Sequence, residues 1–280
     1  MKPSPITLPA RDAYPLTGVL YRSSQNPQRV VVINNATGVS QHFYRHFAAA
    51  LAAAGFTALT YDYRGIGDSK PTSLRGFAAA VRDWALLDMA GVLDWVRETL
   101  HPERIFFVGH SLGGQVAGLL EDASPIDGMV TQSAQSGYWR LQGGEQKLVV
   151  LLHVHLTLPL LARLFGYLPW SRFGGSQDLP KAAALEWARW CRHPRYLLGD
   201  PTLPLDRYAR FSAPVLAYSF ADDKWGTPRA VDAMMRAYPN LERRHVEHAE
   251  LGLKAIGHFG YFRPTATLLW NETIRWLDTL

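Results

Sequence analysis

A Gly-x-Ser-x-Gly motif at residues 109–113 places Ser111 where it could act as a nucleophile. An apolar, strand-like run at residues 104–108 precedes the motif, and a helix-like pattern follows it at residues 112–121. A serine at such a tight strand-to-helix turn has a strained backbone, which small neighbours permit, and its hydroxyl projects from the carboxyl edge of a sheet. Backbone amides at the start of the helix would favour negative charge developing there. We therefore predict that Ser111 is the nucleophile of an acyl-transfer reaction.

A glycine-rich turn can instead bind phosphate or simply connect two elements. Residues 109–114 lack the Lys-Ser/Thr ending of a P-loop and the three-glycine spacing of a dinucleotide site, so we favour the nucleophile. A serine hydroxyl reacts poorly at neutral pH and needs a base, which a carboxylate in turn orients. The chemistry therefore requires a histidine and an acidic residue near Ser111.

The elements that would position these groups alternate along the chain between strand and helix patterns. This alternation predicts a mostly parallel sheet covered by helices on both faces. Residues 6–8 and 16–21 lie too close together for a crossover helix, so we expect an antiparallel edge there. The other expected strands are residues 30–33, 56–61, 104–108, 128–132, 215–220 and 243–246, and the expected helices are residues 41–54, 84–96, 112–121 and 265–279.

Composition excludes several other classes of protein. The chain has 280 residues, 48% of them hydrophobic, which is enough apolar surface for a sizeable core. Its net charge of +5 comes from scattered residues without a basic cluster, so nucleic-acid binding is not expected. The single cysteine, Cys191, rules out an internal disulfide and favours the cytoplasm. The uncharged stretch at residues 148–162 is short for a membrane span, and residues 1–10 contain no run typical of a signal peptide.

With this motif and this order of elements, the sequence resembles the α/β-hydrolase superfamily over nearly its whole length. Besides the serine motif, residues 62–69 match the Asp-x-Arg-Gly-x-Gly-x-Ser segment of many members. Residues 35–38, 179–180 and 186–190 look like a poorly characterised bacterial group of predicted serine hydrolases. The resemblance implies an eight-stranded, mostly parallel sheet with helices on both faces and a helical cap inserted after strand six.

In this superfamily the catalytic acid follows the nucleophile in the chain, beyond the next-to-last strand. Asp222 and Asp223 both stand at that place. Members often show Gly-x-x-Asp there, and Asp223 lies three residues after Phe220, which occupies the glycine position. We therefore predict Asp223 as the acid, with Asp222 as the alternative.

The resemblance places the catalytic base in the loop before the terminal helix. His258 lies in such a loop, flanked by Gly257 and Gly260, and we predict that it is the base. His245 and His248 lie in or at the end of the expected last strand and are interpreted as surface or strand residues.

Two backbone amides are expected to stabilise the oxyanion. The amide of Leu112, directly after the nucleophile, is one predicted donor. The second should come from the loop after the strand at residues 30–33. Aligning residues 33–36 with the usual apolar-His-Gly-x pattern indicates Ala36, with Thr37 as the alternative.

Residues 137–206 differ in character from the rest of the chain, with four tryptophans and several prolines. The segment is too long for a structureless loop, so we predict a helical cap there and a hydrolase core of residues 1–136 and 207–280. Its aromatic density is compatible with a pocket lining or with ordinary packing. Asp178 is a candidate N-cap for a helix at residues 179–191, which must end before Pro194.

These inferences predict a serine hydrolase that cleaves an ester-like bond of a hydrophobic small molecule through an acyl-enzyme on Ser111. We expect no cofactor and no metal, because Ser111, His258 and Asp223 complete the chemistry. An acyltransferase with the same residues, or a ligand-binding module that has lost turnover, are the alternatives. The oligomeric state stays open.

Overall fold

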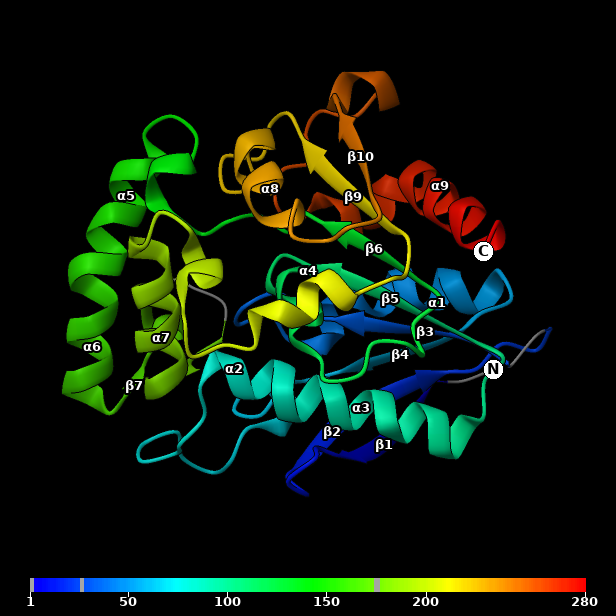
Figure 1. Ribbon diagram of the computed structural model, residues 1–280, viewed down its shortest axis with the longest axis horizontal. Coiled ribbons are helices and arrows are strands. Elements are labelled where there is room, and N and C mark those ends of the chain that lie inside the picture. The colour runs from blue at the N-terminus through cyan, green and yellow to red at the C-terminus, as the bar shows by residue number, and fades with distance from the viewer. Residues whose placement is uncertain (1–2, 26–27, 174–176) are drawn as a thin grey trace.

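The computed structural model describes residues 3–25, 28–173 and 177–280. Its centre is an eight-stranded sheet in the order β1-β2-β4-β3-β5-β6-β9-β10 (Figure 1). Strand β2 pairs antiparallel with β1 and β4, and all the other pairs are parallel. This confirms the predicted mostly parallel sheet and its antiparallel edge. The strands are Ser4–Pro9 (β1), Pro15–Tyr21 (β2), Arg29–Asn34 (β3), Thr57–Tyr61 (β4), Arg104–His110 (β5), Gly128–Gln132 (β6), Val215–Phe220 (β9) and Leu241–Val246 (β10).

Helices cover both faces of the sheet because its central strands are apolar on both sides. In β3, Val30 and Val32 face one hydrophobic cluster, while Val31 and Ile33 face the other. The first cluster includes side chains of α3 and α8, and the second includes side chains of α1 and α9. The helices are Arg45–Ala53 (α1), Val81–Asp83 (α2), Ala90–Trp95 (α3), Leu112–Gln115 (α4), Pro228–Met235 (α8) and Thr267–Asp278 (α9), with π-helical turns at Trp84–Met89 and Val96–Leu100.

The chain between β6 and β9 forms a group of helices at one end of the sheet (Figure 1). Its elements are α5 (Gln146–Leu152), a π-helical turn (His153–Thr157), α6 (Leu158–Phe165), the short pair β7 (Tyr167–Leu168) and β8 (Leu179–Pro180), and α7 (Lys181–Arg192). The segment Gln146–Phe165 runs as one helix of 20 residues, which by length and composition alone could span a membrane. The prediction from the 15-residue uncharged stretch did not anticipate this length.

The predicted N-cap of the last of these helices is wrong. Helix α7 begins at Lys181 after Pro180 and has no side-chain cap. The carboxylate of Asp178 instead accepts hydrogen bonds from the amide and hydroxyl of Ser171, at 3.0 and 2.7 Å. The helix ends at Arg192, before Pro194, as predicted.

Candidate active site

Ser111 forms the sharp turn between strand β5 and helix α4. Its backbone has φ 49° and ψ −113°, in a region that residues with a side chain rarely adopt. Glycines permit the turn by allowing backbones to pack closely: a Cβ on Gly109 would overlap the backbone of Gly114, and a Cβ on Gly113 would overlap the carbonyl of Asn34 in β3. The spacing of the motif is therefore a consequence of how closely the strand and helix cross.

His258 and Asp223 form a buried hydrogen-bonded pair. Nδ1 of His258 lies 2.8 Å from Oδ2 of Asp223, and the two side chains are 10% and 0% exposed. Burial alone would raise the pKa of Asp223, but the His258 ring, the amide of Gly226 and the hydroxyl of Ser133 together hold that pKa at about 2. The carboxylate is therefore ionised at neutral pH. It favours the tautomer of His258 that carries its proton on Nδ1 and directs Nε2 away from the pair.

Asp222 has a different task from its neighbour. Its carboxylate accepts hydrogen bonds from the amides of Ile256 and Gly257, at 2.8 and 2.9 Å. It therefore holds the loop that carries His258 without contacting the imidazole. Of the two candidate acids, the structure places Asp223 beside His258.

The two other C-terminal histidines have local partners. Nδ1 of His245 lies 2.9 Å from the hydroxyl of Ser219 in β9, and the ring of His248 is bonded to the carbonyl of Leu253. Both interactions agree with the interpretation as strand or surface residues.

Ser111 and His258 line one cavity of about 520 Å³. The Ser111 hydroxyl donates to Oε1 of Gln135 at 3.3 Å, and within the described part of the chain no hydrogen bond joins it to His258. A bond of that length is weak, and catalytic hydrogen bonds commonly tighten only when substrate binds. The structure thus brings the predicted nucleophile and base to one cavity, with Ser111 turned toward Gln135.

The predicted oxyanion donors differ in what their amides contact. Leu112 is the first residue of α4, and its amide has no partner among the described residues. The amide of Ala36 donates to the buried hydroxyl of Tyr44 at 2.9 Å. The Ala36 amide is therefore already bonded to a buried acceptor. Thr37, the alternative, lines the cavity, and no hydrogen bond within residues 3–25, 28–173 and 177–280 uses its amide.

A chain of hydrogen bonds runs behind the serine from the Ala36 turn to the loop of His258. The Tyr44 hydroxyl accepts from the Ala36 amide and lies 2.9 Å from Nδ1 of His110, and Nε2 of His110 lies 2.8 Å from the carbonyl of His258. Since a carbonyl can only accept, we assign the proton of His110 to Nε2. Burial, together with the neighbouring His258 ring, lowers the pKa of His110 to about 3. The ring is therefore a neutral, fixed link next to Ser111.

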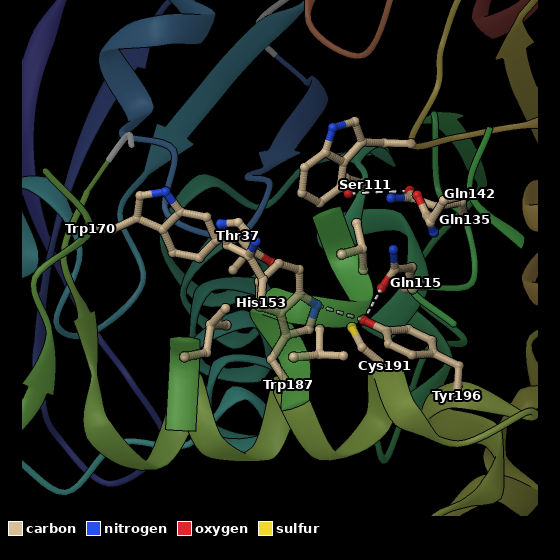
Figure 2. Close-up of a pocket in the computed structure, with 15 residues that line it drawn as sticks. Thr37, Ser111, Gln115, Gln135, Gln142, His153, Trp170, Trp187, Cys191 and Tyr196 are labelled. Atoms are coloured by element: carbon tan, nitrogen blue, oxygen red, sulfur yellow. Dashed lines mark hydrogen bonds between the residues drawn. The ribbon is translucent and has the colours of Figure 1, made fainter. Parts of the chain in front are cut away.

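Ser111 also borders a smaller inner cavity of about 30 Å³, which is drawn in Figure 2. Gln115, Gln135 and Gln142 are among the residues that line it. Side chains of α5, α6 and α7 also line it, and Trp170, Trp187 and Trp225 line both cavities. Among the described residues, no aspartate or glutamate lines either cavity.

Sequence reasoning missed four residues that hold this site together: Tyr44, His110, Ser133 and Gln135. Ser133 donates to Oδ2 of Asp223 at 2.7 Å. Ser133 and Gln135 follow the strand predicted at residues 128–132. Once this strand is placed beside the strand that ends at Ser111, their position in the sequence indicates that they lie near the serine. Tyr44 gave no such signal, because the sequence does not fix which way its helical turn faces.

Comparison with solved structures confirms the fold. An esterase of Pyrococcus furiosus has a TM-score of 0.63 at 15% identity, covering 99% of this chain and 91% of its own. A proline iminopeptidase of Mycobacterium smegmatis has a TM-score of 0.65 at 16% identity, covering 99% and 98%. A monoacylglycerol lipase of Paleococcus ferrophilus has a TM-score of 0.61 at 16% identity, covering 94% and 98%. The likeness confirms the α/β-hydrolase fold.

A family model gives a more particular assignment. Residues 25–184, more than half of the chain, match the model of the serine aminopeptidase family S33. The chain belongs to this family and is a serine hydrolase of the α/β-hydrolase superfamily. It is also 30% identical over 89 residues to the lysophosphatidylserine lipase ABHD12 of Danio rerio, a match that spans 30% of this chain and 21% of that protein.

The close crossing at the serine turn predicts a stability effect. We expect Gly109→Ala to lower the free energy of unfolding by roughly 1–3 kcal/mol or more, because the new Cβ meets the backbone of Gly114 instead of a movable side chain. Urea unfolding followed by circular dichroism measures this change in the free energy of unfolding. Gly143→Ala is the control, since its Cβ would lie 3.4 Å from its nearest neighbours. Equal stability of the two variants would contradict the packing explanation.

The environment of His110 predicts a titration effect. We expect its ring to stay neutral, with the proton on Nε2, from pH 8 down to about pH 4, because burial lowers its pKa to about 3. An unfolded histidine binds a proton below about pH 6.5, so the folded state loses up to about 1.4 kcal/mol of stability per pH unit as pH falls from there toward 3. Nitrogen-15 shifts of the histidine rings report the tautomer. A His110 signal that titrates near pH 6.5 would rule this out.

Proposed function

We propose that the protein hydrolyses esters of hydrophobic small molecules through an acyl-enzyme on Ser111. The observation that carries the proposal is the buried pair of His258 and ionised Asp223 at a cavity that Ser111 shares. In this mechanism the Ser111 hydroxyl leaves Gln135, gives its proton to Nε2 of His258 and attacks the ester carbonyl. Asp223 stabilises the imidazolium that forms.

The remaining steps use backbone donors and water. The amides of Leu112 and Thr37 stabilise the oxyanion of the tetrahedral intermediate, and the His258 imidazolium then protonates the departing alcohol. Water, deprotonated by His258, cleaves the acyl-enzyme and regenerates the Ser111 hydroxyl. Donors of this kind contribute about a hundredfold to a thousandfold each to turnover.

The residues that line the two cavities favour an ester substrate that carries no charged group near the scissile bond. Three tryptophans line both cavities, and a volume of about 520 Å³ lies within the range of small-molecule sites. An aminopeptidase must hold a substrate ammonium, and a buried cation needs a carboxylate partner. Since none of the described cavity residues is acidic, an uncharged, hydrophobic substrate fits the site better than a peptide N-terminus.

We also propose that residues 137–206 act as a cap on a core of residues 1–136 and 207–280. Residues 1–2 and 26–27 of the core and residues 174–176 of the cap lie outside the described residues. Support comes from α5, α6 and α7, which contribute Val150, Leu158 and Cys191 to the wall of the inner cavity. We propose a cytoplasmic location because the chain has a single cysteine, Cys191, which is free and buried.

Covalent labelling tests the nucleophile. A fluorophosphonate probe is expected to modify Ser111, located by mass spectrometry of the peptide, whereas Ser111→Ala should not react. Hydrolysis of a chain-length series of p-nitrophenyl esters then tests the reaction class. An unmodified Ser111 under saturating probe would favour a ligand-binding module instead, and rates near background across the series would argue against an esterase.

The adjacent acids provide a matched pair of variants. We expect Asp223→Asn to lower kcat by about 10⁴-fold, because it removes the charge that holds the tautomer of His258. Asp222→Asn should reduce kcat far less and mainly lower the free energy of unfolding, by about 1–3 kcal/mol, since its carboxylate accepts hydrogen bonds from the loop amides. Steady-state kinetics and urea unfolding separate the two effects. The opposite order of kcat losses would exclude Asp223 as the acid.

A further inference from the structure

The helix Gln146–Phe165 exposes an unusual amount of apolar surface. Of the large hydrophobic side chains that are exposed among the described residues, most lie on this helix or just after it. Five leucines recur at every fourth position along it, each between 54% and 69% exposed: Leu148, Leu152, Leu156, Leu160 and Leu164. Val149 on the same helix and Phe173, which follows it in the chain, are 46% and 64% exposed. We call these seven residues the leucine face.

A π-helical turn keeps the leucine face on one side. On a regular α-helix, a four-residue spacing drifts by about 40° at each step, so the stripe would wind round the helix toward its buried side. The wider turn at His153–Thr157 rotates the chain by less per residue and reverses part of this drift. The five leucines consequently remain exposed over the whole length of the helix.

The opposite side of the helix is bound to the rest of the protein. Val150, Val154, Leu158 and Ala162 are buried. Three of these four also line the inner cavity beside Ser111, and a side chain of α7, Arg192, donates to the carbonyl of Val154 at 3.1 Å. The helix is therefore anchored along one side and lies at the margin of the molecule in Figure 1, and the leucines on its other side are exposed. This arrangement favours contact with an apolar surface over passage through a bilayer.

The charges around the leucine face identify its partner. Residues 146–173 contain Lys147, Arg163 and Arg172, all exposed, and no acidic residue. Glu145 directly precedes this segment, and Asp178 accepts hydrogen bonds from Ser171 within it. A second copy docked through the same face would bring cations of one copy near cations of the other, which is unfavourable. A surface that is both apolar and anionic complements the leucines and the cations together.

We propose that the leucine face docks on the surface of an anionic lipid bilayer, with the helix lying parallel to it. The leucines and Phe173 enter the boundary between headgroups and acyl chains, and Lys147, Arg163 and Arg172 contact lipid phosphates. A docked helix would place the cavity beside Ser111 directly behind the lipid surface. Only this last consequence rests on the proposed function; the docking itself does not.

Vesicle binding tests the docking directly. We expect the full chain to co-sediment with vesicles of phosphatidylcholine and phosphatidylglycerol, less with phosphatidylcholine alone, and less at high salt. The double variant Leu156→Glu/Leu160→Glu should bind at least about tenfold more weakly. Leu268→Glu is the control, because Leu268 is 57% exposed on α9, outside the leucine face. Circular dichroism and thermal unfolding verify that each variant folds.

A charge variant and a catalytic variant complete the experiment. Lys147→Ala/Arg172→Ala should weaken binding to the anionic vesicles and leave the weaker binding to neutral vesicles unchanged. Ser111→Ala should bind vesicles like the unaltered chain. If the unaltered chain docks on vesicles but does not hydrolyse esters, the proposed function is wrong and the docking stands. Equal binding of the Leu156→Glu/Leu160→Glu and Leu268→Glu variants would overturn the docking. So would a dimer, detected by light scattering, that the leucine variant dissociates.

Discussion

A buried negative charge is the constraint on which the site depends. The carboxylate of Asp223 is withdrawn from water, a position that is very costly for an ion without partners. Each of its oxygens has two donors: the amides of Trp225 and Gly226 on one, and the Ser133 hydroxyl and His258 ring on the other. These donors come from the ends of β6 and β9 and from the loop before α9. Stabilising one charge therefore fixes three segments of chain relative to each other.

The neutral ring of His110 also holds separate segments of the chain together, on the other side of Ser111. It joins the turn after β3, the end of β5 and the His258 loop without placing another charge in the site. Burial keeps the ring uncharged, so its two nitrogens can serve one as acceptor and the other as donor. Ser111, Asp223 and His258 thus depend on two hydrogen-bonded groups that share the His258 loop, one ionic and one neutral.

The helix Gln146–Phe165 connects this site to the outside of the molecule. Its inner side helps to close the space around Ser111, while its outer side consists of leucines that the fold leaves uncovered. An apolar surface of this size on a chain otherwise well packed indicates an interaction surface. The structure therefore combines a densely hydrogen-bonded candidate site with an apolar helix that borders both the cavity and the solvent.

The sequence by itself determined the sheet, its antiparallel edge and Ser111 as the nucleophile candidate, because these follow from local periodicity and from a motif whose glycines are close-packing requirements. It also narrowed the acid to two neighbours, Asp222 and Asp223, and the second oxyanion donor to Ala36 or Thr37. The tertiary structure shows Asp223 beside His258 and the Ala36 amide bonded to Tyr44. Adjacent residues on a strand end or turn point in different directions. Their contacts, with His258 for Asp223 and with the nearby helical turn of Tyr44 for Ala36, depend on how the chain packs. The bare leucine face also became visible only in the fold, since an apolar residue shows in sequence that it can be buried, but not whether anything covers it.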